Sequence, residues 1–272
     1  MTRVALRICL AAALIYFVYT IGTSAAELYR GQAIVTGQGE ANRTLGVASC
    51  LEDVLIKVSG FQGLAGDPRL TPYKSNAENL VEALNYHDQM SGTPTRDEQG
   101  TRDRPYDLIV DFDPKKIDDL LKALGIEPWL ARRPVLGVLV GLQQGATNFI
   151  ITDDADRSAL QRESLLAAAS KRGMAIVLPS MVALKKSNIN YASLSTIAPS
   201  ILGSVTAARG GEVVLVGRLV WDDRDLGWAV QWQMDWQNRT RHWQMRGVTF
   251  DEAFRRGIGN AAQILSNNGD PP

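Results

Sequence analysis

Histidine and cysteine are scarce in this 272-residue chain, which holds two of each. That scarcity excludes dense disulfide scaffolds and zinc modules built from several cysteines. Neither sign of charge is in excess, because Lys+Arg and Asp+Glu both number 29, so no basic surplus favours nucleic acid. The sequence also lacks a G-x-S-x-G elbow, a P-loop, an H-E-x-x-H pair and a C-x-x-C pair. We therefore expect no cofactor, no metal and no nucleic acid partner, and we favour a non-catalytic protein over an enzyme.

The amino terminus has the pattern of a secretory signal. Arg3 and Arg7 precede an apolar run of about 14 residues from Ile8 to Ile21, and the small residues at 24–26 follow it. This run is shorter than the ~20 residues that cross the hydrocarbon core of a bilayer. We predict cleavage after Ala26, and a periplasmic or secreted protein without a stable membrane span. The alternative is an uncleaved segment that anchors the chain in the inner membrane.

Cleavage would leave Cys50 as the single cysteine of the mature chain. Its helical neighbours Val47, Leu51 and Val54 are apolar, so we predict a buried thiol. A redox or nucleophilic role for Cys50 is the alternative.

The first half of the mature chain mixes strand and helix patterns. Apolar periodicity and turn residues predict, in order, a strand at Leu28–Thr36, a helix at Glu40–Val58, a second helix at Pro72–Leu84, a hairpin with an exposed polar tip at Ser91–Arg104, a strand at 107–113, and a helix that Asp113 caps and Gly125 ends. Together these elements predict an α+β domain.

The pattern changes after Pro134. Near-continuous apolar runs predict buried strands at Val135–Leu142, Met174–Leu178 and Gly211–Trp221, with helices at Arg157–Lys171 and near Ser195–Ala208 between them. We therefore predict an α/β (α+β) protein of two small sandwich domains, each a mixed sheet with helices packed against it. The predicted boundaries are a signal at 1–26, an N-terminal domain at 27–130 and a C-terminal domain at 131–268.

Five of the six tryptophans fall between Trp221 and Trp243. Alternation from Trp228 to Trp236 predicts a strand with one apolar face. With a turn at Asn238-Arg239, Met234 lies opposite Trp243, Trp232 opposite Met245, and Val230 opposite Gly247. A last helix, begun by a capping box of Thr249 and Glu252, is predicted to cover this face.

The alternative is that the aromatic face is exposed and binds a glycan, a peptide or a protein, since large uncovered apolar patches mark interaction sites. The residues proposed for an interaction surface are Trp228, Trp232, Trp236 and Trp243, together with Arg96 and Arg102 in the exposed hairpin tip.

Carboxylates supply the remaining candidates for chemistry. Asp111 and Asp113 alternate along a strand and could form a pair, although helix capping explains Asp113 more simply. The acidic groups at 153–156 and 222–225 read as solvated turns rather than metal ligands. His87 and His242 have no nucleophile nearby in the sequence, and Gly37-Gln38-Gly39 reads as the entry to a helix.

Two resemblances follow from longer stretches. Residues 54–60 with Asp67-Pro68, then 107–113, then 125–129 and 133–136, are similar to the proteobacterial domain of unknown function 2066, which implies an exported protein of uncharacterised activity. Residues 211–218, two antiparallel strands and a last helix resemble the α/β domain of periplasmic accessory proteins, such as the outer-membrane activators of penicillin-binding proteins and the amino-terminal domain of TolB.

These observations predict an exported accessory or protein-binding module of the cell envelope, whose partner is an envelope protein or a peptidoglycan-associated one. One alternative is an envelope hydrolase that acts on glycan or peptide through strand-borne carboxylates. Another is a protein that binds a small ligand between its domains, near Trp129 to Pro134.

Overall fold

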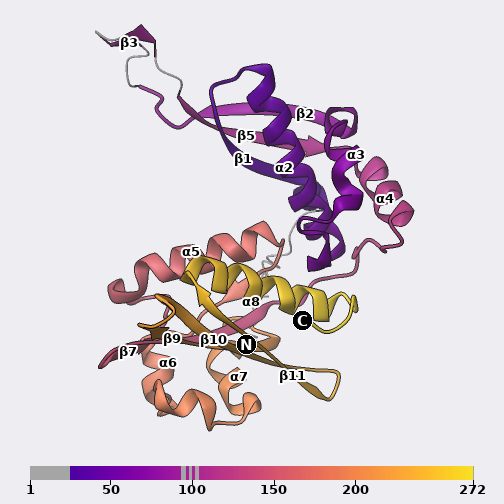
Figure 1. Cartoon of the computed structure of the whole chain (residues 1–272). Coiled ribbons are helices and arrows are strands. Elements are labelled where there is room, and N and C mark those ends of the chain that lie inside the picture. The colour runs from indigo at the N-terminus through magenta and orange to yellow at the C-terminus, as the bar shows by residue number, and fades with distance from the viewer. Residues whose placement is uncertain (1–24, 93–95, 98–99, 102–103, 272) are drawn as a thin grey trace, which may run out of the picture.

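The computed structural model describes residues 25–92, 96–97, 100–101 and 104–271. Figure 1 shows two sheets, one in each half of the chain, with helices packed against both. The protein is therefore an α/β protein, as the alternation of patterns predicts. Residues 1–24 of the predicted signal segment at 1–26 lie outside the described residues, and its last two residues begin α1.

The N-terminal half contains a three-stranded antiparallel sheet in the order β1-β5-β2. Its elements are α1 Ala25–Leu28, β1 Arg30–Thr36, α2 Glu40–Ser59, the short 3-10 helices η1 Gln62–Leu64 and η2 Pro68–Leu70, α3 Thr71–Lys74, η3 Ala77–Leu80, β2 Val81–Asp88, the β3 (Arg96–Asp97) and β4 (Gly100–Thr101) pair, β5 Pro105–Phe112 and α4 Pro114–Ala123. One face of the sheet packs on α2, and Leu51, Val54 and Leu55 form the centre of this core with Leu108 and Val110.

The predicted helix at Pro72–Leu84 is wrong. The chain forms only α3 and η3 there, and β2 then begins at Val81. Ala77, Val81 and Leu84 fit helical spacing, but Leu84 and Tyr86 also fit the period of a strand, and pairing with β5 decides between the two. The helix after residue 113 forms as predicted, because the Asp113 carboxylate accepts hydrogen bonds from the backbone N–H groups of Lys115 and Lys116.

The C-terminal half contains a six-stranded mixed sheet. The strands run in the order β11-β10-β9-β6-β7, with β8 beside β6, and β6 is parallel to both β9 and β8. The elements are β6 Leu136–Gln144, β7 Thr147–Ile150, η4 Asp156–Ser158, α5 Ala159–Lys171, β8 Ile176–Val177, α6 Met181–Lys186, η5 Ala192–Ser195, α7 Pro199–Ala207, β9 Val213–Asp222, β10 Gly227–Trp236, β11 Arg239–Val248 and α8 Phe250–Leu265. The sequence missed β7 and α6, which are short.

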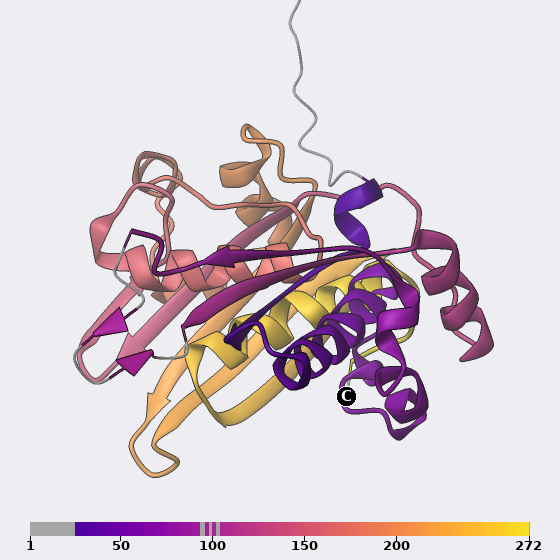
Figure 2. The same ribbon diagram turned by 90° about the horizontal axis from the view of Figure 1, so that it is seen from above.

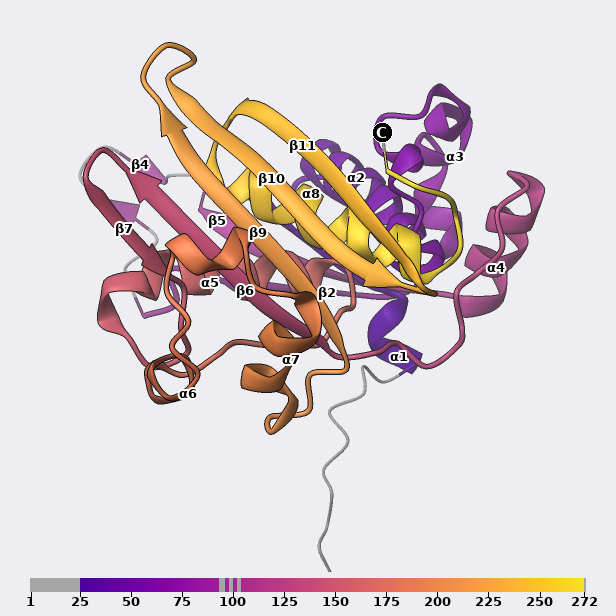
Figure 3. The same cartoon turned by 90° about the horizontal axis from the view of Figure 1, so that it is seen from below.

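Helices cover both faces of this sheet. Figure 1 shows α5 and α8 between the sheet and the N-terminal half, with α6 and α7 on the opposite face. Seen from below in Figure 3, α6 and α7 lie over the side of the sheet formed by β6 and β9 and leave β10 and β11 uncovered. Among the described residues, no helix is both long and apolar enough to cross a membrane.

The tryptophan hairpin forms, but its predicted register is wrong. The turn is Gln237-Asn238, both with left-handed φ angles of 51° and 58°, so Trp232 lies opposite Trp243 and Met234 opposite Arg241. A two-residue turn with both residues left-handed matches the twist of the strands, and asparagine tolerates that conformation well. Moving a turn by one residue shifts the pairing by two, so both registers keep the same face apolar.

Candidate functional site

A groove of about 910 Å³ runs along β1. One wall is β1, whose seven residues all line the groove. The other is the side of α2 that carries Asn42, Leu45, Ser49 and Asp53. These α2 positions recur every three or four residues and therefore share one helix face.

The groove follows the free edge of the N-terminal sheet. In the order β1-β5-β2, β1 has β5 on one side and no strand on the other. Tyr29 accepts a hydrogen bond from the backbone N–H of Phe112 (3.0 Å), and Gly37 donates one to the carbonyl of Arg104 (2.8 Å). Because bonded and non-bonded pairs alternate in an antiparallel ladder, the odd-numbered residues of β1 face β5. The even-numbered residues turn their N–H and C=O groups to the free edge.

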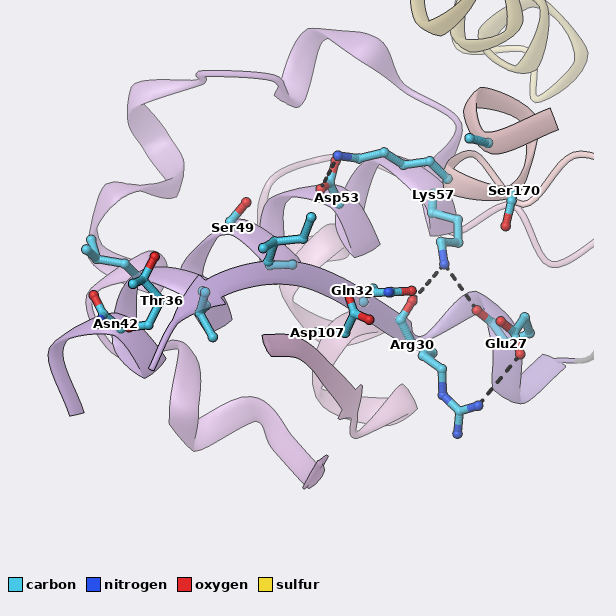
Figure 4. A pocket seen from close by; sticks show the side chains of 18 residues that line it. Glu27, Arg30, Gln32, Thr36, Asn42, Ser49, Asp53, Lys57, Asp107 and Ser170 are labelled. Carbon is cyan, nitrogen blue, oxygen red and sulfur yellow. Dashed lines mark hydrogen bonds and ion pairs between the residues drawn. The ribbon is translucent and has the colours of Figure 1, made fainter. Parts of the chain in front are cut away.

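The two ends of this edge are bonded to α2. The Lys57 ammonium donates to the carbonyls of Arg30 (2.7 Å) and Glu27 (3.2 Å), as Figure 4 shows, and the Asn42 amide donates to the carbonyl of Thr36. Between these ends, the backbone groups of Gln32 and Ile34 have no hydrogen-bonding partner among the described residues. A short stretch of strand edge is therefore open to another extended chain.

The apolar side chains near this edge are exposed rather than packed. Ile34 is 70% exposed and Leu45 is 71% exposed. Two glycines, Gly31 on β1 and Gly46 on α2, allow the strand to pack closely on the helix, and this close packing fixes the shape of the groove. A Cβ at Gly31 would lie 2.7 Å from the Cβ of Cys50, and one at Gly46 would lie 2.7 Å from Val35.

The groove is closed at its Arg30 end by the C-terminal half. Ala167, Ser170 and Lys171 of α5 line it there, and Figure 4 shows Ser170, Lys57 and Glu27 together at that end. Asp53 on α2 pairs with Lys171 (2.9 Å) and with the buried Arg172 (3.4 Å), which ties α5 to α2.

The residues predicted for an interaction surface lie elsewhere. Trp228, Trp232 and Trp243 are buried beneath α8, with Trp232 only 1% exposed, so an exposed platform of these three rings is wrong. The apolar stripe of α8 covers them, and Gly257 permits this contact because a Cβ there would lie 2.3 Å from the Trp232 ring. Trp236 is half-buried. Arg96 lies in β3 opposite Thr101 of β4, and Arg102 lies outside the described residues.

The candidate carboxylates have separate partners. The guanidinium of Arg30 donates to both oxygens of Asp111 (2.7 and 3.2 Å), whereas Asp113 caps α4. Because β5 ends at Phe112, the two acids do not form a pair on one strand face, and the simpler interpretation of Asp113 as a helix cap is confirmed. Asp153 pairs with Arg209, and Asp154 accepts a hydrogen bond from the backbone of Met181, which lowers its pKa.

The other candidates also have local structural surroundings. His87 lies 3.4 Å from Asp107 on an exposed surface, and His242 is exposed. Cys50 is buried as predicted, and burial raises the pKa of its thiol to about 12. Within the described residues, no group of three or more His, Cys, Asp or Glu is arranged to hold a metal ion.

The segment at Trp129–Pro134 is packed between the halves. Trp129 is buried, its ring contacts the Arg133 guanidinium (4.3 Å), and Arg133 donates to the backbone carbonyls of Lys57 (2.7 Å) and Arg172 (2.9 Å).

The sequence missed the groove although two of its residues depart from their local pattern. Leu45 is an apolar residue away from the apolar stripe of its helix, and Lys57 is a charge within the run Val54–Val58. Both departures indicate side chains whose role is not to pack in the hydrophobic core.

Comparison with known proteins gives one family match. Residues 23–130 match the model of a family described as a domain of unknown function, DUF8605. This is a different family from the domain of unknown function 2066, so that resemblance is wrong; most of the residues quoted for it lie in α2 and β5, where apolar periodicity explains them without a shared family. No curated protein matches the chain, so nothing supports the resemblance of the second half to periplasmic accessory proteins.

Proposed function

We propose that this protein is an exported, non-catalytic binding module of the cell envelope that holds an extended segment of a partner protein along β1. The observation that carries the proposal is the unpaired edge at Gln32 and Ile34, set in a groove beside α2. An added strand pairs with these backbone groups, while neighbouring pockets select alternate side chains of the segment.

The alternative reading of a bare edge is a structural liability. Proteins protect free edges with short strands, charges, proline or bulges, because an open edge pairs with other chains. The middle of β1 carries Gln32 and Ile34 instead, without a charge, proline or bulge. The charged side chain at its start, Arg30, is paired with Asp111 on the adjacent strand. A partner strand supplies the missing hydrogen bonds and covers Ile34 and Leu45.

Export is part of the proposal and rests on the amino-terminal pattern. Leu28 and Tyr29 are buried in the N-terminal core, so the residues that cleavage after Ala26 would leave include the buried part of α1. Sequencing the amino terminus of the protein purified from its own host should give Glu27. An intact Met1 on protein found in the cytosol would overturn the export proposal.

A displayed library of random ten-residue peptides tests strand addition. The variant Ile34→Pro removes one N–H from the free edge and no bond to β5, whereas Ile34→Thr keeps that N–H and serves as the control. Selected peptides should bind the wild type and Ile34→Thr, and should lose at least about tenfold in affinity for Ile34→Pro. Equal binding to the folded proline variant, or no selected peptide, would overturn the proposal.

A further inference from the structure

The Arg30 end of the groove carries buried positive charge that has no carboxylate partner. Lys57 is 8% exposed, and its ammonium bonds only to the carbonyls of Glu27 and Arg30, which leaves one of its three N–H donors. Arg133, next to it, likewise bonds only to backbone carbonyls, and its Nε is buried without a partner. Burying a charge without an opposite charge is costly, so these two cations would favour an anion at this end.

The nearby acids are already paired. Glu27 and Asp111 both lie against the guanidinium of Arg30, and Asp53 is held by Lys171 and Arg172. One further carboxylate, Asp107, lines the groove, but it lies opposite Ile34 on β5 and accepts a hydrogen bond from the Gln89 amide (2.7 Å). Lys57 is thus a cation that lines the groove without an ion-pair partner among the described residues.

The hydrogen bond from Lys57 also determines where an added strand must stop. Its ammonium donates to the carbonyl of Arg30 on the free edge. A longer added strand would need that carbonyl as the acceptor for its next backbone N–H. Beyond it, Glu27 of α1 and Ser170 and Lys171 of α5 line the groove, from two elements that converge there (Figure 4). A chain that ends at this point in a carboxylate fits, whereas a chain that continues meets these two elements.

We infer that the segment bound along β1 is the extreme carboxyl terminus of a partner protein, with its terminal carboxylate bonded to the Lys57 ammonium. This inference rests on the proposed strand addition and names the partner class for the same groove. The segment then runs antiparallel to β1, because its end lies at the start of that strand. Capture of a terminal carboxylate beside an added strand is a known mode of peptide recognition.

The register follows from the free edge. The residues that bond to Gln32 and Ile34 are the second and the fourth from the end of the segment, and the last residue lies opposite Gly31. The third residue from the end lies opposite Ala33, and its side chain points toward α2 between Leu45 and Ser49. Because Leu45 is exposed and apolar, this position selects an apolar side chain.

The test compares one peptide in two chemical forms. A library of random seven-residue peptides displayed with free carboxyl termini is selected on the protein, and the best peptide is synthesised as the free acid and as the carboxyl-terminal amide. The free acid should bind at least about tenfold more tightly than the amide, because a charge-assisted hydrogen bond to a buried ammonium is lost with the charge. The selected peptides should also share an apolar third residue from the end.

Variants locate the effect. Lys57→Met should bind the acid and the amide equally, whereas Lys122→Met, which changes an exposed lysine on α4, should keep the preference for the acid. If the free-acid and amide forms of the peptide bind the wild type equally well, and binding still requires the N–H of Ile34, this inference is overturned and strand addition stands. If no peptide binding depends on Ile34, both proposals are overturned. The comparison of acid with amide on the wild type needs no variant to fold.

Discussion

At the scale of single residues, packing rather than chemistry governs the side chains that stand out in the sequence. By residue type we would expect a reactive thiol at Cys50 and a binding surface at Trp232 and Trp243, yet each of these side chains is at most 5% exposed. Lys57 is the opposite case, since it is a charge inside a run of apolar residues and its ammonium lines a groove. Desolvation lowers its pKa and burial raises that of Cys50, so both groups favour their neutral forms more than in water.

Cys50 should be unreactive in the folded protein. With a thiol pKa of about 12, roughly one molecule in 10⁴ carries the thiolate at pH 8. Ellman's reagent should therefore label Cys50 at least about a hundredfold more slowly in the native state than in urea. The unfolded thiol ionises first as the pH rises, so the free energy of unfolding should fall above about pH 9, and Cys50→Ala should weaken that fall. Rapid native labelling would contradict burial.

Gly257 should be the least replaceable residue of α8. A Cβ at this position would lie 2.3 Å from the Trp232 ring, which is itself fixed between the sheet and the helix. Gly257→Ala should lower the free energy of unfolding by about 1–3 kcal/mol through overpacking, as measured by urea denaturation. Gly39→Ala is the control, since nothing lies within 4 Å of a Cβ there and its φ is −63°. Equal stabilities for the two variants would show that α8 does not fit closely on Trp232.

At the scale of elements, β1 has two different edges. Its odd-numbered residues bond to β5, while the groups of Gln32 and Ile34 face the groove. The side chains follow the same alternation, so Gly31, Ala33 and Val35 face α2 and the even-numbered residues lie on the outer face. Position along β1 therefore decides whether a backbone change affects folding or binding.

Proline substitutions at adjacent positions should separate these roles. Ala33→Pro removes a ladder bond to β5 and should cost about 1–3 kcal/mol of stability, whereas Ile34→Pro should cost less than about 1 kcal/mol. Thermal and urea unfolding followed by circular dichroism measures both. A larger loss for Ile34→Pro than for Ala33→Pro would mean that the assignment of bonded and free positions on β1 is reversed.

At the scale of the whole molecule, the two halves are joined by buried polar contacts. Arg172 is 5% exposed and reaches Asp53 from α5, while the amide of Asn268 donates to the carbonyl of Ser59 (2.8 Å). Figure 2, seen from above, shows α2 in front of α8, and a Cβ at Gly60, just after α2, would lie 3.1 Å from the carbonyl of Ala262 in α8. The first half therefore packs on the helix layer of the second. One end of the groove thus depends on both halves.

Asp53→Asn should weaken the contact between the halves. Arg172 would keep its buried charge without a carboxylate, which should cost about 1–3 kcal/mol, whereas Asp119→Asn breaks an exposed pair with Lys115 on α4 and should cost less than about 1 kcal/mol. Five of the six tryptophans lie at 221–243 and Trp129 lies between the halves, so the fluorescence reports chiefly the second half. In Asp53→Asn, the fluorescence and circular dichroism transitions in urea should separate. Coincident transitions at unchanged urea concentration would show that this ion pair does not couple the halves.

Local patterns were enough for much of the fold. The period of the apolar residues determined α2, β6, β9, α8 and the tryptophan hairpin, and the carboxylate of Asp113 determined where α4 begins, because these features depend on neighbours in the sequence. The helix predicted at Pro72–Leu84 was wrong because its apolar residues fit both the helical and the strand period, and pairing with β5 favours the strand. The register of the hairpin failed since two turns one residue apart bury the same face.

The candidate site, in contrast, was decided by the tertiary structure. The sequence by itself determined that β1 and α2 form, that Cys50 is buried, and that an apolar face of tryptophans needs a cover. Only the folded chain decided that β1 lies at the edge of its sheet, because strand order depends on contacts between residues some 80 positions apart, such as Arg30 with Asp111. The folded chain also placed α5 across one end of the groove, where the ammonium of Lys57 is desolvated and therefore interacts more strongly with an anion.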